Sequence, residues 1–370
     1  QSMPGTLAPP PWPYAKKCEG FSTVHELPAP VPSPFIQPKV YNRPRLPRSD
    51  KELPLLHAPG PLKLTAATDI VLLPGNVVLT RKGKILPQTF LRHRRSLHGA
   101  VRKRQWSDRF EPCVPVGDLE LETIDRPLFF ADTDHPDVYG HVLLEALPRL
   151  WALRRAGIAV SVATSVPVSG AYAPLFRWLG VDIDSITAID RPIHGKTILF
   201  PDLPMRRRSW IHPAAWEVFH ALAGLGDRSD VGTPERIYLS RSRVPGRRLV
   251  NELAIEALFK RMGFAIIHPQ EMPIEAQIRV FSHARCFASA GGSSAHNALF
   301  APQASRVLIL SSESWLVNAD ILLSQTPGRL GYVFGRPLQL PIRSHRSQSD
   351  WQIDPDEVAA AARIHFDIPG

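Results

Sequence analysis

The chain has 370 residues, of which 44% are hydrophobic and 21% are charged. This length predicts two domains at about 150 residues each, and the apolar content excludes a globally disordered chain. No run of 18 apolar residues occurs, so we expect no integral membrane protein. The three cysteines lie far apart without a CxxC pair, which argues against a disulfide framework and a cysteine-rich zinc site and favours a reducing compartment.

Basic residues outnumber acidic ones by 44 to 34, which gives a net charge of +10 and favours anionic partners. Much of the excess lies in residues 92–109. Two interpretations of this segment stay open: a solvated basic loop, and a contact with a polyanion or an anionic membrane surface. No RNP, KH or Cys/His finger pattern accompanies the charge, so we expect no specific nucleic-acid binding.

Composition divides the N-terminal third into two parts. Residues 1–61 hold 15 of the 38 prolines. Because proline fixes φ and removes a donor, we expect an extended arm there, either wrapped on the body or disordered. Residues 62–110 are predicted to form a small β-meander, with hairpin turns at 74–76 and 82–84, followed by the basic segment.

Strand-like and helix-like segments then alternate, which is typical of βαβ units with a parallel sheet. In residues 111–230 we predict strands at 128–131, 158–163 and 196–200 and helices at 140–156, 174–179 and 213–222. After a polar linker at 224–234, residues 231–345 repeat the pattern, with strands at 236–240, 264–268, 286–290 and 306–310 and helices at 251–262, 273–283, 293–300 and 316–324. Residues 346–370 end in a helix at 355–364. The fold class predicted is α/β with two Rossmann-like domains.

Two motifs in the second predicted domain suit an anionic ligand. Residues 291–297, Gly-Gly-Ser-Ser-Ala-His-Asn, follow an apolar strand and open a helix, where glycines admit a ligand to the backbone and free N–H groups favour phosphate. Residues 238–243, Tyr-Leu-Ser-Arg-Ser-Arg, place guanidiniums at the end of another strand, where open α/β sheets bind ligands. The alternative for residues 291–297 is a turn whose Gly and Ser only cap the helix. The alternative for residues 238–243 is a solvated basic loop.

A third motif lies in the predicted helix 140–156. His141 and Glu145 are four residues apart and share a face that Arg149 extends, so either could take a proton from an attacking hydroxyl. The alternative is a capping histidine with an ordinary Glu145–Arg149 ion pair. Pro148 should bend the helix. We expect no metal, because HExxH is absent and Asp132-Thr-Asp134 is a lone DxD.

Several other enzyme classes are disfavoured by missing motifs. The sequence contains no GxSxG, no GxxxxGK[ST] and no GxGxxG near a first strand. These absences argue against a serine hydrolase elbow, a P-loop and a nucleotide-sugar epimerase or dehydrogenase.

Three blocks in this order resemble glycosyltransferase family 61, of the capsular-polysaccharide-biosynthesis type. They are YGHVLLEALPRLWAL (139–153), RIYLSRSRVPGRRLVNE (236–252) and EAQIRVFSHARCFASAGGSSAHNALFAP (275–302). The resemblance implies a GT-B fold, in which two Rossmann-like domains face a cleft, and an inverting, metal-independent transfer without a cofactor. His296 and Ala290 depart from the usual family residues, which leaves the nucleotide and the sugar open.

The resemblance also implies roles for individual residues. His141 and Glu145 would be catalytic, with His141 as base and Glu145 orienting it or serving instead. The donor nucleotide-sugar would be bound by Ser240, Arg241, Arg248, Asn251, Glu252, Glu275, Gln277, Gly291, Gly292, Ser293, Ser294 and Asn297. Leaving-group charge would be stabilised by cations and amide donors.

The function predicted is transfer of a sugar to a glycan or lipid-linked glycan hydroxyl, in surface polysaccharide or lipopolysaccharide synthesis. We expect a cytoplasmic enzyme, peripheral to the inner membrane where its basic face contacts anionic lipid. The alternative is a non-enzymatic, basic polyanion-binding protein.

Overall fold

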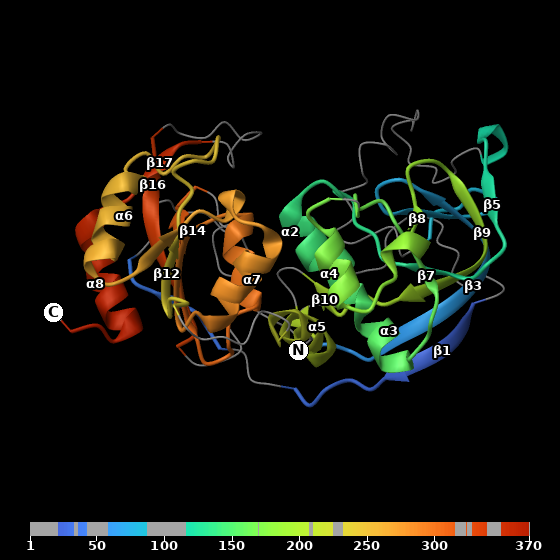
Figure 1. The fold of residues 1–370 in the computed structure, drawn as a ribbon, viewed down its shortest axis with the longest axis horizontal. Coiled ribbons are helices and arrows are strands. Elements are labelled where there is room, and N and C mark those ends of the chain that lie inside the picture. Colours follow the sequence, from blue (N-terminus) through green and yellow to red (C-terminus); the bar gives the residue numbers. More distant parts are fainter. Residues whose placement is uncertain are drawn as a thin grey trace, which may run out of the picture. The chain divides into compact units, whose positions relative to one another are not determined.

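A computed structural model of the chain describes residues 21–32, 36–42, 58–86, 116–168, 170–206, 210–224, 232–314, 323, 328–338 and 349–369. The chain divides into two compact units, each with its own sheet (Figure 1). Unit 1 comprises Gln1–Pro28, Pro61–Gly170 and Gly180–Pro204, and unit 2 comprises Ala29–Gly60, Ala171–Leu179 and Met205–Gly370. No helix among the described residues has the length and apolar character needed to cross a membrane.

Unit 1 is built on an eight-stranded mixed sheet in the order β1-β3-β9-β6-β7-β8, with β4 paired to β3 and β5 to β9. The strands are β1 (Ser22–Leu27), β3 (Leu62–Leu73), β4 (Val77–Thr80), β5 (Glu122–Ile124), β6 (Leu128–Phe130), β7 (Ser161–Thr164), β8 (Thr187–Ala188) and β9 (Ile193–Pro201). Strands β9, β6, β7 and β8 are parallel. Chain order reverses between β6 and β9, and such a switch point is where α/β sheets bind ligands.

The predicted helix 140–156 is broken into four pieces. They are α2 (Tyr139–His141), the π-helical turn η4 (Val142–Ala146), the 3₁₀ turn η5 (Leu147–Leu150) and α3 (Trp151–Ala156). Pro148 has no N–H and therefore cannot donate to the Leu144 carbonyl. The Leu147 amide donates to Val142 O, five residues back, which is the π-helical pattern. Two further 3₁₀ turns of unit 1 are η3 (Val116–Asp118) and η6 (Ile183–Ser185).

Unit 2 contains a seven-stranded sheet in the order β13-β12-β14-β15-β16-β17, with β2 paired to β16. Its strands are β2 (Lys39–Val40), β12 (Arg236–Leu239), β13 (Ala265–Ile267), β14 (Cys286–Ala290), β15 (Arg306–Ser312), β16 (Leu330–Pro337) and β17 (Trp351–Gln352). All run parallel except β17. The switch point of this sheet lies between β12 and β14. A separate hairpin joins β10 (Met205–Arg206) and β11 (Trp210–Ile211).

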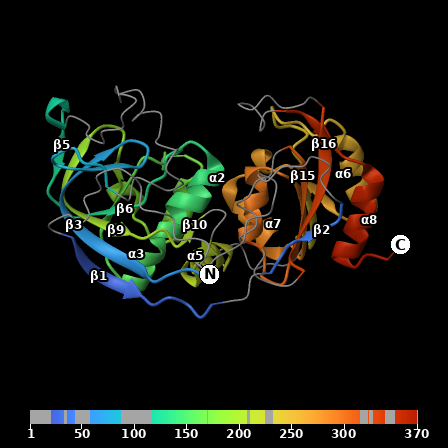
Figure 2. The ribbon, with the colours of Figure 1, turned by 180° about the vertical axis from the view of Figure 1, so that it is seen from behind.

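Helices cover both faces of the sheet in unit 2: α6 and α8 lie on one face and α7 on the other (Figures 1 and 2). The helices are α4 (Ala173–Trp178), α5 (Pro213–Gly224), α6 (Glu252–Arg261), α7 (Ile274–His283) and α8 (Pro355–Phe366), with 3₁₀ turns η7 (Pro269–Glu271) and η8 (Ser293–Leu299). The apolar faces of α6 and α8 share one core with β12, β14, β15 and β16. This packing fixes the strand ends that carry the candidate residues.

The structure corrects two of the predicted domain boundaries. The hairpin of β3 and β4 is not a separate meander, because β3 pairs along most of its length with β9 of unit 1. Residues 205–224, predicted to belong to the domain 111–230, belong to unit 2. Apolar patterning cannot reveal either relation, since both depend on contacts distant in sequence.

The predicted arm 1–61 provides edge strands in its described part, where β1 pairs with β3 and β2 with β16. Other predictions fall outside the described residues. These are the basic segment 92–109, most of the linker 224–234 and most of the helix 316–324.

Candidate functional site

The turn after β12 in unit 2 is held by two glutamates of α6. Glu252, 2% exposed, accepts hydrogen bonds from the Tyr238 hydroxyl at 3.0 Å and the Arg241 amide at 2.6 Å. Glu256 accepts from the Ser240 and Ser242 hydroxyls, both at 2.6 Å. Burial raises the pKa of Glu252. This network fixes the backbone from which the Arg241 side chain extends.

The Arg241 side chain lies against the glycine turn after β14. A Cβ added to Gly292 would lie 2.6 Å from Arg241 Nη1. Any side chain at this position would therefore displace the guanidinium. The backbone of Gly292 is extended, with φ 161°, so close approach and not conformation requires this glycine. The structure therefore brings together two predicted donor residues, one from each side of the switch point of unit 2.

A second cation lies next to Arg241. Arg247 follows the turn with a left-handed backbone, φ 51°. Burial lowers the pKa of both guanidiniums, and the charge of Arg241 lowers the pKa of Arg247 further. Two like charges that are partly shielded from water form a site that an anion would stabilise.

The glycine turn continues into η8, which is a 3₁₀ helix and not the predicted α-helix. At Gly291 an added Cβ would lie 3.3 Å from Leu310 O, so β15 crowds this position. Ser294 Oγ is buried and makes no hydrogen bond in the structure. Asn297 is fully buried. The backbone and Ser294 are thus positioned at the end of β14 beside Arg241.

Several other predicted donor residues make contacts within unit 2. The Arg248 side chain donates to Asp350 Oδ2 through Nε at 3.0 Å and Nη2 at 2.7 Å. The Asn251 side chain bonds both backbone groups of Ile353. Gln277 Nε2 donates to Pro269 O, in the first residue of η7, and to Met272 O, just after η7. Glu275 lies in the first turn of α7. These contacts give Arg248, Asn251 and Gln277 a structural role.

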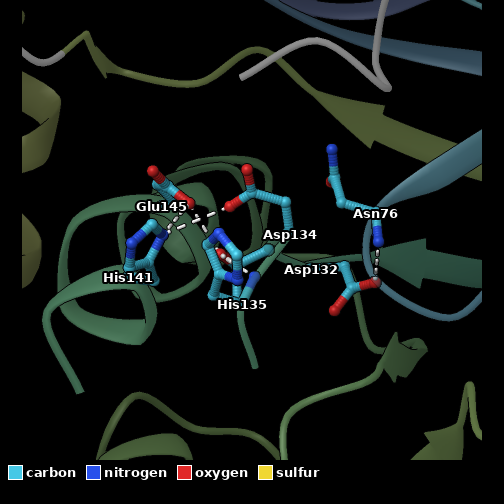
Figure 3. Close-up of polar contacts among 7 residues, drawn as sticks. Asn76, Asp132, Asp134, His135, His141 and Glu145 are labelled. Carbon is cyan, nitrogen blue, oxygen red and sulfur yellow. Dashed lines mark hydrogen bonds and ion pairs between the residues drawn. The ribbon is translucent and has the colours of Figure 1, made fainter. Parts of the chain in front are cut away.

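The predicted catalytic pair lies in unit 1, at the carboxyl end of β6 (Figure 3). His141 Nδ1 is 3.0 Å from Glu145 Oε2 and 3.2 Å from Asp134 Oδ1. Glu145 is buried and also accepts from the Thr133 hydroxyl at 2.6 Å. Both carboxylates flank one imidazole nitrogen, an arrangement that orients the ring.

The residues around this pair are anchored by buried charges. Asp132 is fully buried and accepts from the Asn76 and Ser165 amides at 2.9 and 2.8 Å, while burial raises its pKa. Arg149 donates to Pro201 O at 3.1 Å, and burial lowers its pKa to about 10. Asp132 thus ties the start of the loop after β6 to the turn between β3 and β4 and to the end of β7, and Arg149 ties η5 to β9.

Residues 139–308 match the family model described as Glycosyltransferase 61. Over these residues the chain is similar to glycosyltransferase family 61. The match contains all three sequence blocks and confirms the resemblance. It indicates glycosyltransferase activity, and therefore a sugar donor and an acceptor as substrates. No curated protein matches the chain.

Two further residues near the pair are Asp134 and His135, and both precede the matched region. Sequence reasoning named Asp134 only as part of the lone DxD pattern, and it missed His135. The rings of His135 and His141 meet edge-on with centroids 4.5 Å apart. Asp134 and His135 come close to His141 because the loop after β6 turns back towards the helix.

The chain also has a polar pocket of about 490 Å³ at the carboxyl ends of β15 and β16. Its lining includes Asn42, Glu313, Phe334, Arg336 and Glu357. None of the predicted donor residues lines it. The candidate anion site between β12 and β14 is thus a separate feature of unit 2.

Proposed function

We propose that this protein is an inverting, metal-independent glycosyltransferase that transfers a sugar from a nucleotide-sugar to a glycan or lipid-linked glycan hydroxyl. Units 1 and 2 act as the acceptor and donor domains of a GT-B enzyme. The observation that carries the proposal is the contact of Arg241 with Gly292, with Arg247 beside it. The reaction belongs to surface polysaccharide or lipopolysaccharide synthesis.

The donor diphosphate fits the charge and the space at this switch point. A diphosphate carries negative charge that offsets the repulsion between Arg241 and Arg247, and guanidiniums bind phosphate oxygens through paired hydrogen bonds. The N–H groups at the start of η8 and the Ser293 hydroxyl serve as further donors to it, and Gly292 contributes by leaving room for the Arg241 guanidinium. Ser240 and Glu252 act indirectly, by holding the turn that carries Arg241.

The transfer step needs a base for the acceptor hydroxyl. Carboxylates only accept hydrogen bonds, so Asp134 and Glu145 favour the tautomer with a proton on Nδ1 of His141. Nε2 then keeps its lone pair and takes the hydroxyl proton as oxygen attacks the anomeric carbon. The bond to the nucleoside diphosphate breaks on the opposite face, and the guanidiniums stabilise the departing charge.

Donor binding is tested by thermal shift and calorimetry of the full chain with UDP, GDP, CDP and ADP in the presence of EDTA. We expect stabilisation by one of them and its loss in Arg241→Ala. The matched control is Arg243→Ala, because Arg243 is exposed and pairs with Glu271. Stabilisation by heparin alone, or an unaltered response of Arg241→Ala, would reject the donor site.

Transfer is tested with a panel of nucleotide-sugars. Arg241→Ala should lower turnover on the order of 100-fold, by analogy with the loss of an oxyanion donor. His141→Ala should retain nucleoside diphosphate binding and lose transfer. Glu145→Gln tests whether Glu145 orients His141 or is itself the base. Loss of both binding and transfer in His141→Ala would indicate misfolding and contradict its role.

We place the enzyme in the cytoplasm, peripheral to the inner membrane. The support is the net charge of +10, which favours contact with anionic lipid. Flotation with vesicles of rising phosphatidylglycerol content tests this. Flotation that is insensitive to anionic lipid would contradict it.

A further inference from the structure

Carboxylate and imidazole groups converge in the loop after β6. One potential ligand atom from each of Asp134, His135 and His141 lies within 4.8 Å of the others. The described residues hold no other group of three histidine, cysteine or acidic side chains that could bind a metal. Figure 3 shows these side chains gathered with Glu145 on one side of the helix that begins at Tyr139.

The spacing of these atoms is close to that of a metal site. Zinc binds nitrogen and oxygen at about 2.0–2.1 Å, so two ligands at a tetrahedral edge lie about 3.3 Å apart. The distances from His141 Nδ1 to Asp134 Oδ1 and Glu145 Oε2 are 3.2 and 3.0 Å. His135 is exposed, and its ring meets the His141 ring edge-on with centroids 4.5 Å apart, which keeps it beside the other two ligands.

The surroundings hold the ligands in place. The side chains of Asp134 and His141 are 8% and 14% exposed, which leaves few alternative rotamers. Glu145 is fixed by the Thr133 hydroxyl. Contacts of this kind orient metal ligands and raise affinity.

We propose that Asp134, His135 and His141 bind a divalent transition-metal ion of the zinc class, with Glu145 as the fourth ligand. Two imidazoles with carboxylates suit zinc, and calcium or magnesium would prefer oxygen alone. The ion takes the position of the proton on Nδ1 of His141. A neutral imidazole that binds metal through Nδ1 carries its proton on Nε2 and has no lone pair left.

This tautomer gives the ion an inhibitory effect, a consequence that rests on the proposed function. The base at Nε2 is lost when the metal binds, so zinc stops transfer reversibly although the transfer itself uses no metal. Donor binding in unit 2 does not depend on the ion.

The test is titration of the EDTA-treated and dialysed full chain with Zn²⁺ by calorimetry and with Co²⁺ by visible absorption. We expect one ion per chain with the intense bands of four-coordinate cobalt. His135→Ala should weaken Zn²⁺ binding at least about tenfold, and His283→Ala on α7 serves as the matched control. Equal Zn²⁺ affinity of wild type and His135→Ala, with circular dichroism unchanged, would overturn the site.

The inhibitory effect is measured separately. Zn²⁺ should inhibit transfer by the wild type, EDTA should restore it, and His135→Ala should resist inhibition relative to its own rate. Stimulation by Zn²⁺ would overturn the inhibitory role, and binding of a nucleoside diphosphate without Zn²⁺ binding would overturn the metal site alone.

Discussion

The Tyr238 hydroxyl donates to Glu252 Oε1, the same buried oxygen that accepts the Arg241 amide. Tyr238→Phe removes one of these two donors and leaves a buried carboxylate less satisfied. We expect a loss of about 1–2 kcal/mol in the free energy of unfolding, measured by urea denaturation. A double-mutant cycle with Glu252→Gln isolates the pair. Additive effects of the two substitutions would contradict the coupling.

Gly292→Ala should displace the guanidinium of Arg241 without unfolding the chain. The added Cβ meets the flexible end of a side chain, and backbone atoms are farther away. We expect nucleoside diphosphate affinity to fall by about tenfold or more, as for loss of a charge-assisted hydrogen bond. Calorimetry measures the affinity. Gly224→Ala is the control, because an added Cβ there meets no atom within 4 Å, and equal affinities of the two variants would refute the argument.

Arg248 pairs with Asp350 and is largely exposed. Arg248→Ala should therefore change nucleoside diphosphate affinity less than Arg241→Ala does, and it should mainly loosen the segment around Asp350. Hydrogen exchange of residues 349–353 measures this loosening. If both arginine variants weaken binding equally, Arg248 leaves Asp350 to contact the donor, as the family resemblance implied.

Stability should fall in mild acid because of His365. Burial lowers its pKa to about 4, below the unfolded value of about 6.5. The unfolded chain therefore binds an extra proton between these limits, so the contribution is complete above pH 6.5 and is lost as the pH falls towards 4. The loss is on the order of 3 kcal/mol.

His365→Gln is the matched variant for this effect. Glutamine does not titrate and can keep a hydrogen bond to the Tyr41 hydroxyl, which lies 2.9 Å from His365 Nδ1. Urea unfolding at pH 7, 5.5 and 4.5 should show a shallower decline than in the wild type. Parallel declines would assign the acid sensitivity to other groups.

Local pattern predicted the elements of unit 2 well. The apolar run 286–290 is bounded by turn residues and forms β14 with the predicted ends. Turn chemistry likewise identified the hairpin between β3 and β4. The strand-end positions of Arg241 and Gly292 followed from this alternation, because parallel strands bring their carboxyl ends to one edge.

Relations between distant residues could not be predicted in this way. The pairing of Arg248 with Asp350 spans 102 residues, and the pairing of β3 with β9 spans more than 100. The approach of Asp134 and His135 to His141 depends on how one loop turns back. Hydrophobic periodicity and secondary-structure propensity describe single helices and strands, so they carry no information on contacts between distant residues.

The π-helical turn Val142–Ala146 contains one residue more than an α-helical turn does. Each residue advances an α-helix by about 100°, so deleting a single residue from this turn would swing His141 around the axis relative to Trp151. The imidazole would then leave the carboxylates although every ligand was still present in the sequence. The number of residues in this turn, as much as their identity, therefore sets the direction of the His141 side chain.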